Sequence, residues 1–395
     1  MPCSTWSWTR CLWTRSGSAA TSTTTSTSPG TRRPRWCPPC ARRTGSTSPS
    51  GRRPAPGPPP CRGVPSACAR GCGRDPRPFP LVARVPAVTR IAVLSGGVGG
   101  ARFVCGLVEV VDPAAVTVIG NVGDDCEVLG LHVSPDLDTV LYALASVADD
   151  ERGWGRADET WHALAEVERL GGETWFRLGD RDLGLHLVRT QALQRGQPLS
   201  AITARAAAAF GLATRLLPAS DDRLRTWIDT PAGSFPFQEW FVARRHRDEV
   251  DRVRFQGEES ARPAPGVLEA LAEAELIVIA PSNPFVSIWP ILAVSGIRAA
   301  LERRRAPCVA VSPLVGGRAL KGPADRMLAR LAGGTSPGRV ATCYQGLIDV
   351  LVIDESDAGL AREVEVQGVR PLVTGTVMAD RAARRKLAEA VITCA

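Results

Sequence analysis

Lysine, acidic residues and regular apolar patterning are almost absent from the first 89 residues of the chain. Residues 1–89 hold 14 arginines, no lysine and a single acid, Asp75. Their apolar residues follow neither the helical nor the strand period, so the segment buries too little surface to offset the entropy of ordering it. The sequence predicts a disordered N-terminal leader. Because the whole chain carries +8, the remaining residues carry −5.

The leader also lacks the features of a targeting or nucleic-acid-binding segment. It has no continuous apolar core for a secretory signal and no amphipathic period for a transit peptide. We would expect a nucleic-acid-binding arm to carry lysine as well as arginine, and the leader has no lysine. The composition favours translated non-coding, GC-rich sequence, with Val88 as the native start, and we expect no nucleic-acid partner.

Long apolar runs and regularly spaced cysteines are missing from residues 90–395. No stretch of 18 apolar residues occurs, so we expect no membrane segment. The five cysteines of this part have no regular spacing, which is typical of a reduced, cytoplasmic protein with incidental buried thiols. No internal repeat is apparent.

Five short apolar runs rich in β-branched residues are present instead. Each ends near a Gly, Pro, Ser, Asn or Asp, and helical stretches lie between them. Buried parallel strands have this pattern because helices cover both faces of their sheet. The runs predict an α/β fold with a doubly wound, mostly parallel, Rossmann-like sheet that binds ligands at the carboxyl ends of its strands. They are residues 91–96, 116–121, 276–281, 308–313 and 350–355.

The middle of the chain has a different pattern from the two ends. Residues 90–145 and 266–395 carry the strand-like runs, and we assign them to the Rossmann-like core. Residues 146–265 read as a mainly helical insertion with one strand-like stretch near 225–230. We expect this insertion to close over the ligand edge of the sheet.

A glycine-rich loop, "SGGVGGARF", follows the first predicted strand. Gly96, Gly97, Gly99 and Gly100 precede a helix, where bare backbone N–H groups can reach a phosphate. The loop has no Gly-Lys-Ser/Thr, and Arg102 stands where the dinucleotide fingerprint requires its last glycine. A tight strand-to-helix turn without any ligand is therefore an alternative interpretation.

Four aspartates follow the second predicted strand within a short distance. Asp124 and Asp125 come directly after it, and Asp136 and Asp138 follow in "SPDLDTVLY", near the start of a helix. Clustered carboxylates repel one another unless a cation or ligand donors compensate. Mg²⁺ commonly takes one or two carboxylates together with substrate phosphate oxygens. We favour a functional role for Asp125, whereas Asp136 fits capping of the helix equally well.

A third stretch, "WFRLGDRDL", brackets a glycine with charged residues. Arg177 and Arg181 could face negative charge on a substrate, or they could form a surface salt-bridge turn with the nearby aspartates.

Two further loops follow predicted strands and carry small polar residues. Ser282, Asn283 and Pro284 follow the third strand, and Ser312 follows the fourth. The latter loop continues into Gly316 and Gly317 and then into two cations, Arg318 and Lys321. Because the carboxyl ends of parallel strands share one edge, we expect these loops to converge on one phosphate-bearing site.

The motifs taken together resemble the 2-phospho-L-lactate transferase family of coenzyme F-420 biosynthesis. The resemblance covers residues 90 to the C-terminus, and it departs from the family at Trp289, where we expect a small residue. It is carried, in chain order, by "SGGVGGARF", "NVGDD", "VSPDLDTVLY", "LGDRDL", "LPASDD", "FQEWF", "APSNPFVSIWPIL" and "VSPLVGG".

The resemblance implies an activity and a set of site residues. The family transfers a phospholactyl or phosphoenolpyruvyl unit from its guanosine-diphosphate-activated donor to the deazaflavin Fo and releases GMP. It implies that Asp138 and Arg177 contact the deazaflavin and that Asp124 or Asp125 binds Mg²⁺. The resemblance also places residues of two loops at the guanosine nucleotide: Gly96, Gly97, Gly99, Gly100, Ser282, Asn283 and Pro284. We add Ser312, which follows the fourth predicted strand as Ser282 follows the third.

The expected mechanism is in-line displacement at phosphorus by the primary hydroxyl of Fo. Positioning and charge neutralisation do most of the work in such a transfer. Asp125 is the candidate for holding the metal and for orienting the hydroxyl, with Arg318 or Lys321 as helpers. We expect the enolpyruvyl donor, because the arginine-rich composition is typical of actinobacterial proteins. Sheets of this kind commonly form homodimers.

Two other functions share parts of this pattern. An NAD(P)-dependent oxidoreductase would have a similar sheet, but its second strand should end in an acid for the ribose. The strand ends in Asn121 instead. A GDP-binding regulator without turnover would leave the acidic cluster without a purpose.

Overall fold

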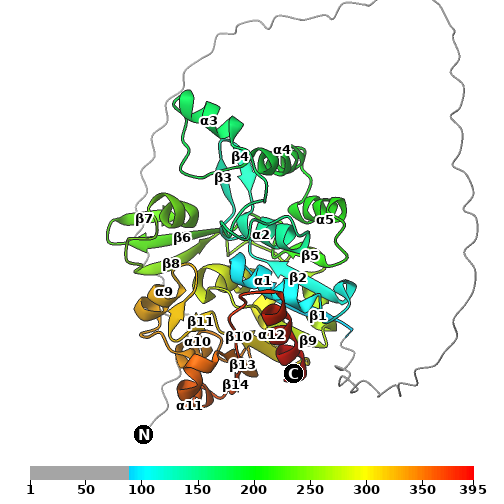
Figure 1. Cartoon of the computed structure of the whole chain (residues 1–395), viewed down its shortest axis with the longest axis vertical. Coiled ribbons are helices and arrows are strands. Elements are labelled where there is room, and N and C mark those ends of the chain that lie inside the picture. The colour runs from blue at the N-terminus through cyan, green and yellow to red at the C-terminus, as the bar shows by residue number, and fades with distance from the viewer. Residues whose placement is uncertain (1–88) are drawn as a thin grey trace, which may run out of the picture. The chain divides into compact units, whose positions relative to one another are not determined.

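A computed structural model describes residues 89–395 of the chain (Figure 1). The predicted leader and the predicted start at Val88 lie outside the described residues.

The core is a seven-stranded sheet in which every pair of neighbouring strands is parallel. Its order is β14-β13-β10-β9-β1-β2-β5. The chain adds β2 and β5 on one side of β1 and then adds the later strands on the other side, so the order reverses between β1 and β9. Ligand crevices form at such a reversal, outside the carboxyl ends of the strands. The strands are β1 (Ile91–Ser95), β2 (Val116–Gly120), β5 (Arg215–Pro218), β9 (Leu276–Ile279), β10 (Cys308–Val311), β13 (Val350–Ile353) and β14 (Arg370–Val373).

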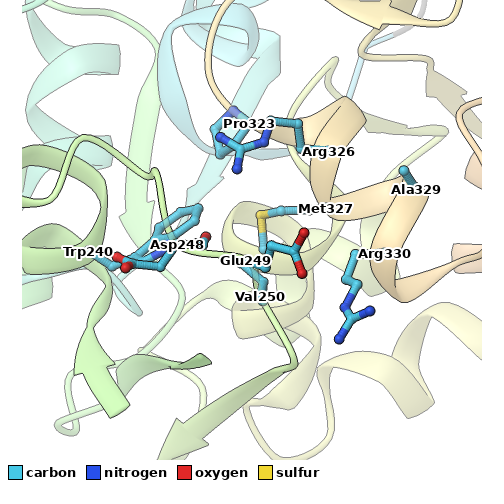
Figure 2. Close-up of a pocket in the computed structure, with 9 residues that line it drawn as sticks. All are labelled: Trp240, Asp248, Glu249, Val250, Pro323, Arg326, Met327, Ala329 and Arg330. Carbon is cyan, nitrogen blue, oxygen red and sulfur yellow. Dashed lines mark hydrogen bonds between the residues drawn. The ribbon is translucent and has the colours of Figure 1, made fainter. Parts of the chain in front are cut away.

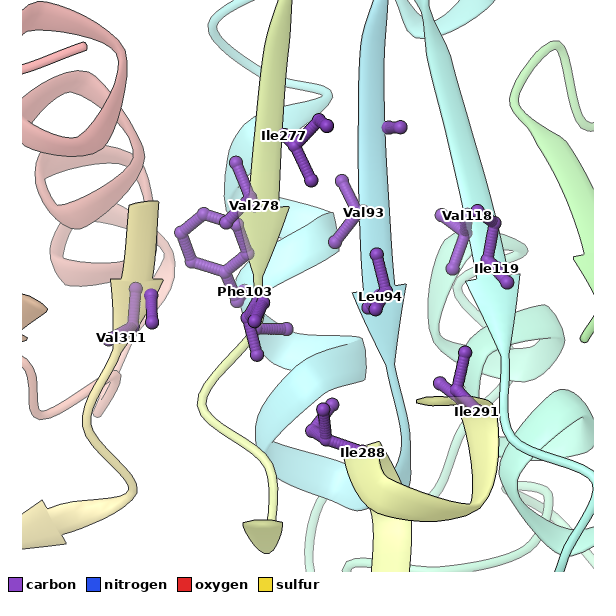
Figure 3. Close-up of a cluster of buried hydrophobic side chains, with 14 of the residues drawn as sticks. Val93, Leu94, Phe103, Val118, Ile119, Ile277, Val278, Ile288, Ile291 and Val311 are labelled. Atoms are coloured by element: carbon purple, nitrogen blue, oxygen red, sulfur yellow. The ribbon is translucent and has the colours of Figure 1, made fainter. Parts of the chain in front are cut away.

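The central strands are apolar on both faces because helices cover both. Every residue of β1, β9, β10 and β13 is buried. Figure 3 shows Val93 and Leu94 of β1 between the side chains of β2 and β9, with Phe103 of the following helix beside Val278. The doubly wound, Rossmann-like α/β class predicted from the apolar runs is therefore confirmed.

Helices follow most strands of the core. The first helix, α1, packs against both α2 and the C-terminal helix α12. None of the helices in the described part of the chain is long and apolar enough to cross a membrane. The helices of the core are α1 (Gly97–Leu107), α2 (Pro135–Leu144), α6 (Val267–Glu273), α7 (Trp289–Ala293), α8 (Ile297–Glu302), α9 (Ala324–Leu331), α10 (Pro337–Cys343), α11 (Ala361–Glu365) and α12 (Arg381–Thr393), with short helical turns η2 (Pro113–Ala115), η4 (Pro284–Ile288) and η5 (Glu355–Leu360).

Residues 146–265 contain more strand than the sequence indicated. The first part is helical, as expected, with α3 (His162–Arg169), α4 (Asp180–Gln194) and α5 (Leu199–Ala209). From Arg215 onward the segment supplies β5 to the main sheet, and then the separate antiparallel sheet β7-β6-β8. The strand expected near 225–230 is β6 (Arg225–Thr230), which pairs with β7 (Gly233–Pro236) and β8 (Arg252–Gln256), and the π-helical turn η3 (Glu239–Ala243) lies between β7 and β8.

Two small hairpins complete the structure. Strands β3 (Cys126–Val128) and β4 (Leu131–Val133) follow the first pair of aspartates, and β11 (Leu314–Val315) and β12 (Arg318–Ala319) follow β10. Figure 1 shows β3, β4, α3 and α4 on one side of the β6–β8 sheet and α9 on the other. The division into a core and an insertion stays a prediction.

Candidate active site

The loops after β1 and β9 are joined directly at the carboxyl edge of the sheet. The Ser282 hydroxyl accepts a hydrogen bond from the Gly96 N–H at 3.2 Å and donates one to the Gly96 carbonyl at 2.8 Å. The two loops predicted to hold the nucleotide thus meet at the point where the strand order reverses.

Three of the four loop glycines are required by packing inside the protein. A Cβ at Gly99 would lie 2.3 Å from the Pro281 carbonyl oxygen, and one at Gly100 would lie 2.3 Å from the Ser95 hydroxyl. A Cβ at Gly96 would lie 2.4 Å from a carboxylate oxygen of Asp136. These contacts account for the missing side chains at these three positions without any ligand, and the left-handed φ of 68° favours glycine at Gly97. Phosphate binding by the loop stays a prediction.

We expect Gly99→Ala to destabilise the protein by about 1–3 kcal/mol, because the Pro281 carbonyl is backbone and cannot move aside cheaply. Gly184→Ala is the matched control: Gly184 lies inside α4 with nothing within 4 Å of its added Cβ. That substitution should stabilise the helix by about 0.5–1 kcal/mol. Chemical denaturation measures both, and equal effects would contradict the packing argument.

Asp136 ties the start of α1 to the loop after β2. Its Oδ1 accepts a hydrogen bond from the Gly97 N–H at 2.7 Å, and its Oδ2 accepts one from the Asn121 amide at 2.9 Å. It lies in the first turn of α2 but its hydrogen bonds serve other segments. Burial raises the pKa of Asp136 to about 6, although these hydrogen bonds oppose the rise.

Asn121 organises the loop that carries the first two aspartates. Its side-chain nitrogen lies 3.1 Å from Asp124 and 3.1 Å from the Val286 carbonyl, in addition to Asp136. Its side-chain oxygen accepts from the Gly123 N–H at 2.7 Å. The sequence marked Asn121 as the end of a strand but did not indicate this role.

Asp124 is buried among groups that disfavour its charge. Its two oxygens accept from the amides of Asn121 and Gln238, each at 3.1 Å. Burial raises the pKa of Asp124 well above its usual value, and the nearby charges of Asp136 and Asp125 add to the rise. Gln238 belongs to the "FQEWF" stretch, to which sequence analysis assigned no site role.

Asp125 has one satisfied and one unsatisfied oxygen. Its Oδ2 accepts hydrogen bonds from the Ser134 hydroxyl and from the His132 ring nitrogen Nε2, both at 2.9 Å. Its Oδ1 is buried and has no hydrogen-bond partner within residues 89–395. Hairpin β3–β4 and the residue after it supply both donors, which sequence reasoning missed.

Asp124 and Asp125 fit a magnesium ion that the substrate helps to hold. No three His, Cys, Asp or Glu side chains gather into a metal site of their own in the described part of the chain. Mg²⁺ does not need such a cage, since it is usually bound by one or two carboxylates, substrate phosphates and water. A cation here would satisfy Asp125 Oδ1 and would relieve the repulsion that raises the pKa of Asp124.

Asp138 is held in a buried polar cluster between α2 and α4. Both of its oxygens accept from Arg189, one of them at 2.9 Å from Nη1. His186 lies next to the pair, and burial lowers its pKa to about 4. Beyond it, Tyr142 donates to Asp182, whose pKa is raised to about 6 by burial. Contact between Asp138 and a deazaflavin stays a prediction.

Arg177 precedes α4 and Arg181 lies in its first turn, and the two residues have different surroundings. The Arg177 guanidinium stacks over the ring of Trp161, 4.5 Å from its centroid. The Arg181 backbone N–H donates to Glu159 at 2.8 Å. Contact between Arg177 and a deazaflavin stays a prediction.

The remaining strand-end residues shape their own loops. The Asn283 side chain accepts from the Phe285 N–H at 3.0 Å and donates to the Met327 sulfur at 3.3 Å, while Pro284 begins η4. The buried Ser312 hydroxyl accepts from the Leu314 N–H at 3.2 Å. Their roles toward a nucleotide are untested.

The Trp289 ring contacts both η4 and α10. It lies edge-on to Phe285 at 4.8 Å, and its indole N–H donates to the Cys343 carbonyl of α10 at 3.4 Å. The large residue therefore fills the contact between η4 and α10.

Of the two cations after β10, Arg318 begins β12 and Lys321 follows that strand. Arg318 is exposed, whereas the Lys321 ammonium lies against Gly153, where an added Cβ would be 2.0 Å from Nζ. Lys321 therefore reaches the loop that precedes α3.

Comparison with known proteins gives close relatives. A phosphoenolpyruvate transferase of Streptomyces griseus is 46% identical over 297 residues, which cover 74% of this chain and 93% of that protein. Proteins of the same name from Streptomyces coelicolor and Mycobacterium tuberculosis are 44% and 41% identical and cover 78% and 72% of this chain, and 98% and 94% of their own lengths.

A solved structure shares the fold at much lower identity. The crystal structure of protein BH3568 from Bacillus halodurans superposes with a TM-score of 0.54 at 18% identity, covering 77% of this chain and 99% of that one. The model of the family described as 2-phospho-L-lactate transferase CofD matches residues 91–392. The chain therefore belongs to the CofD family of 2-phospho-L-lactate transferases, the enzymes of coenzyme F-420 biosynthesis that its motifs resemble.

Proposed function

We propose that this transferase moves a phosphoenolpyruvyl group from a guanosine-diphosphate-activated donor to the deazaflavin Fo, releasing GMP in the cytoplasm. The observation that carries the proposal is the contact between Gly96 and Ser282 at the point where the strand order reverses. Asp136 links this contact to the loop after β2 that carries Asp124 and Asp125. The names of the relatives at 41–46% identity favour the enolpyruvyl over the lactyl donor.

The donor's diphosphate would lie along the loop at residues 96–100, at the N-terminus of α1. The Gly96 and Gly97 N–H groups are taken by Ser282 and Asp136, so the N–H groups of the next residues in the first turn of α1 would meet the phosphates, and the helix dipole adds to the preference for negative charge. Gly97 has a left-handed φ of 68°, which favours glycine at this position of the loop.

Asp125, with Asp124 beside it, would hold magnesium on the diphosphate. When bound, the ion supplies charge neutralisation at the transferring phosphorus. The free Oδ1 of Asp125 is the group available for this, because Ser134 and His132 occupy Oδ2 and fix the orientation of the carboxylate.

The acceptor would approach from the side of β3, β4 and α4, where Asp138 and Arg177 are predicted to meet the deazaflavin. Asp125 would orient its primary hydroxyl toward the phosphorus, and Arg318 and Lys321 would add positive charge near the leaving GMP. In-line displacement of GMP then forms dehydro coenzyme F-420-0.

The test is to incubate purified protein with Fo, Mg²⁺ and each activated donor, and then to weigh the products. We expect a phosphoenolpyruvyl adduct of Fo and equimolar GMP, with the lactyl donor turned over more slowly. Tight GDP binding without any turnover would support a regulator instead. Reduction of a nicotinamide cofactor would support the oxidoreductase.

A further inference from the structure

Arginines on α9 and before α4 have different partners. Arg326 and Arg330 of α9 line a cavity of about 340 Å³ beside the segment that links η3 to β8 (Figure 2). Arg326 donates to two backbone carbonyls of that segment, and Arg330 pairs with Asp251 at 2.7 Å. The exposed Arg177 guanidinium, by contrast, has no hydrogen bond or ion pair within residues 89–395 and lies over the Trp161 ring, 4.5 Å from its centroid. Arg177 is therefore held by an aromatic face rather than by an acceptor.

Trp161 also contacts a second guanidinium, which is itself anchored. The centroid of its ring lies 5.1 Å from Cζ of Arg152, and the Trp154 ring lies edge-on to it at 6.1 Å. Arg152 pairs with Asp149 at 2.8 Å and donates to the Arg156 carbonyl at 2.6 Å. These contacts fix the orientation of the ring over which Arg177 lies.

The N-termini of α3 and α4 cap each other on either side of Trp161. Asp180, the first residue of α4, accepts hydrogen bonds from the backbone N–H groups of His162 and Ala163 in α3, both at 3.0 Å. Glu159, which precedes α3, accepts in return from the N–H groups of the second and third residues of α4, at 2.8 and 2.9 Å. A carboxylate at a helix N-terminus satisfies N–H groups that have no partner within the helix. The exchange therefore fixes Trp161 relative to the start of α4, three residues after Arg177.

The glycine of "LGDRDL" leaves room for this exchange. A Cβ at Gly179 would lie 2.3 Å from Cδ of Glu159 and would displace that carboxylate. Asp182, whose N–H donates to Glu159, also accepts from the Tyr142 hydroxyl of α2 at 2.5 Å. The start of α4 is therefore tied to the segment that carries Trp161 and to the helix that carries Asp138.

A guanidinium that is stacked on a ring keeps its hydrogen-bonding capacity. Stacking occupies the face of the group, and its N–H donors lie in its plane. Such donors suit the carbonyl oxygens of a flat heteroaromatic ligand. A long exposed side chain loses rotamer freedom when it binds, and a ring that already orients it lowers that cost.

We propose that Trp161 is a positioning residue for the acceptor: it holds the Arg177 guanidinium in the orientation in which its N–H groups meet the deazaflavin. Arg152 and the mutual capping of α3 and α4 hold Trp161 in turn. The inference rests on the proposed function, because it assigns the group that places the predicted Arg177 contact.

The test is steady-state kinetics of the full chain with Fo, Mg²⁺ and the enolpyruvyl donor. Trp161→Leu should raise KM for Fo about 3- to 10-fold, as expected for loss of a partly exposed cation–π contact, while kcat and KM for the donor stay within about twofold. Trp161→Phe keeps an aromatic face and should recover most of the loss. Arg177→Met should raise KM for Fo at least as much as Trp161→Leu, and the double variant should show no further rise.

Trp175→Leu is the matched control, since it makes the same change two residues before Arg177. The Trp175 indole donates to Glu173 at 3.2 Å, and its ring lies edge-on to Phe176 at 5.7 Å. This variant should keep the wild-type KM for Fo, and equal melting temperatures check that all variants fold.

Two results overturn the inference and leave the proposed transfer standing. One is a wild-type KM for Fo in Trp161→Leu, and the other is a further rise when Trp161→Leu is added to Arg177→Met, because the ring then acts through another group. An unchanged KM for Fo in Arg177→Met removes the predicted Arg177 contact and the inference with it. Failure of the wild type to transfer any group to Fo overturns the proposed function as well.

Discussion

Asp125→Asn should lower turnover about 100- to 1000-fold while the protein still folds. The substitution removes the carboxylate charge that we assign to the metal and to the attacking hydroxyl, and several kcal/mol of transition-state stabilisation correspond to that loss of rate. The carbonyl oxygen of asparagine can still accept from Ser134 and His132, so the free energy of unfolding should change by no more than about 1 kcal/mol. Steady-state turnover and thermal denaturation measure the two effects.

Glu302→Gln is the matched control for that variant. It makes the same carboxylate-to-amide change in α8, where Glu302 forms an exposed pair with Arg298. Its turnover should equal that of the wild type. Near-normal turnover of Asp125→Asn would remove Asp125 from the mechanism.

Arg189→Ala should destabilise the protein by about 3–5 kcal/mol. Arg189 and Asp138 are both buried, and removal of the guanidinium leaves the Asp138 carboxylate uncompensated between α2 and α4. Chemical denaturation gives the loss directly.

Two further variants separate the buried charge from lost packing. Arg189→Met combined with Asp138→Leu should recover much of the stability, because replacing both partners removes the uncompensated charge. Arg362→Ala, which breaks an exposed pair with Glu365, should cost less than about 1 kcal/mol. If Arg189→Ala proved as mild as Arg362→Ala, the pair would not be the buried contact described here.

The sheet was largely predictable because most of its strands are apolar throughout. The five apolar runs correspond to β1, β2, β9, β10 and β13. The two strands that were missed lie at the edges of the sheet, where one side needs no partner strand. There β5 begins with exposed Arg215, and β14 contains Pro371, a residue that edge strands tolerate.

The candidate site was predictable only in part. The aspartates and strand-end loops could be placed together because parallel strands end at one edge of a sheet. Their hydrogen-bond partners could not, since Gln238 is 114 residues from Asp124 and Arg189 is 51 residues from Asp138. The reason for the glycines at 96, 99 and 100 also needed the structure, because it depends on atoms of α2 and the loop after β9.

A crystal structure of the protein with GDP, Mg²⁺ and Fo tests the account most directly. We expect the diphosphate at the N-terminus of α1 and beside the loop at residues 282–284, the ion on Asp125, and the deazaflavin beside β4 and α4. Ligands bound elsewhere, with the crevice outside β1 and β9 empty, would contradict the account.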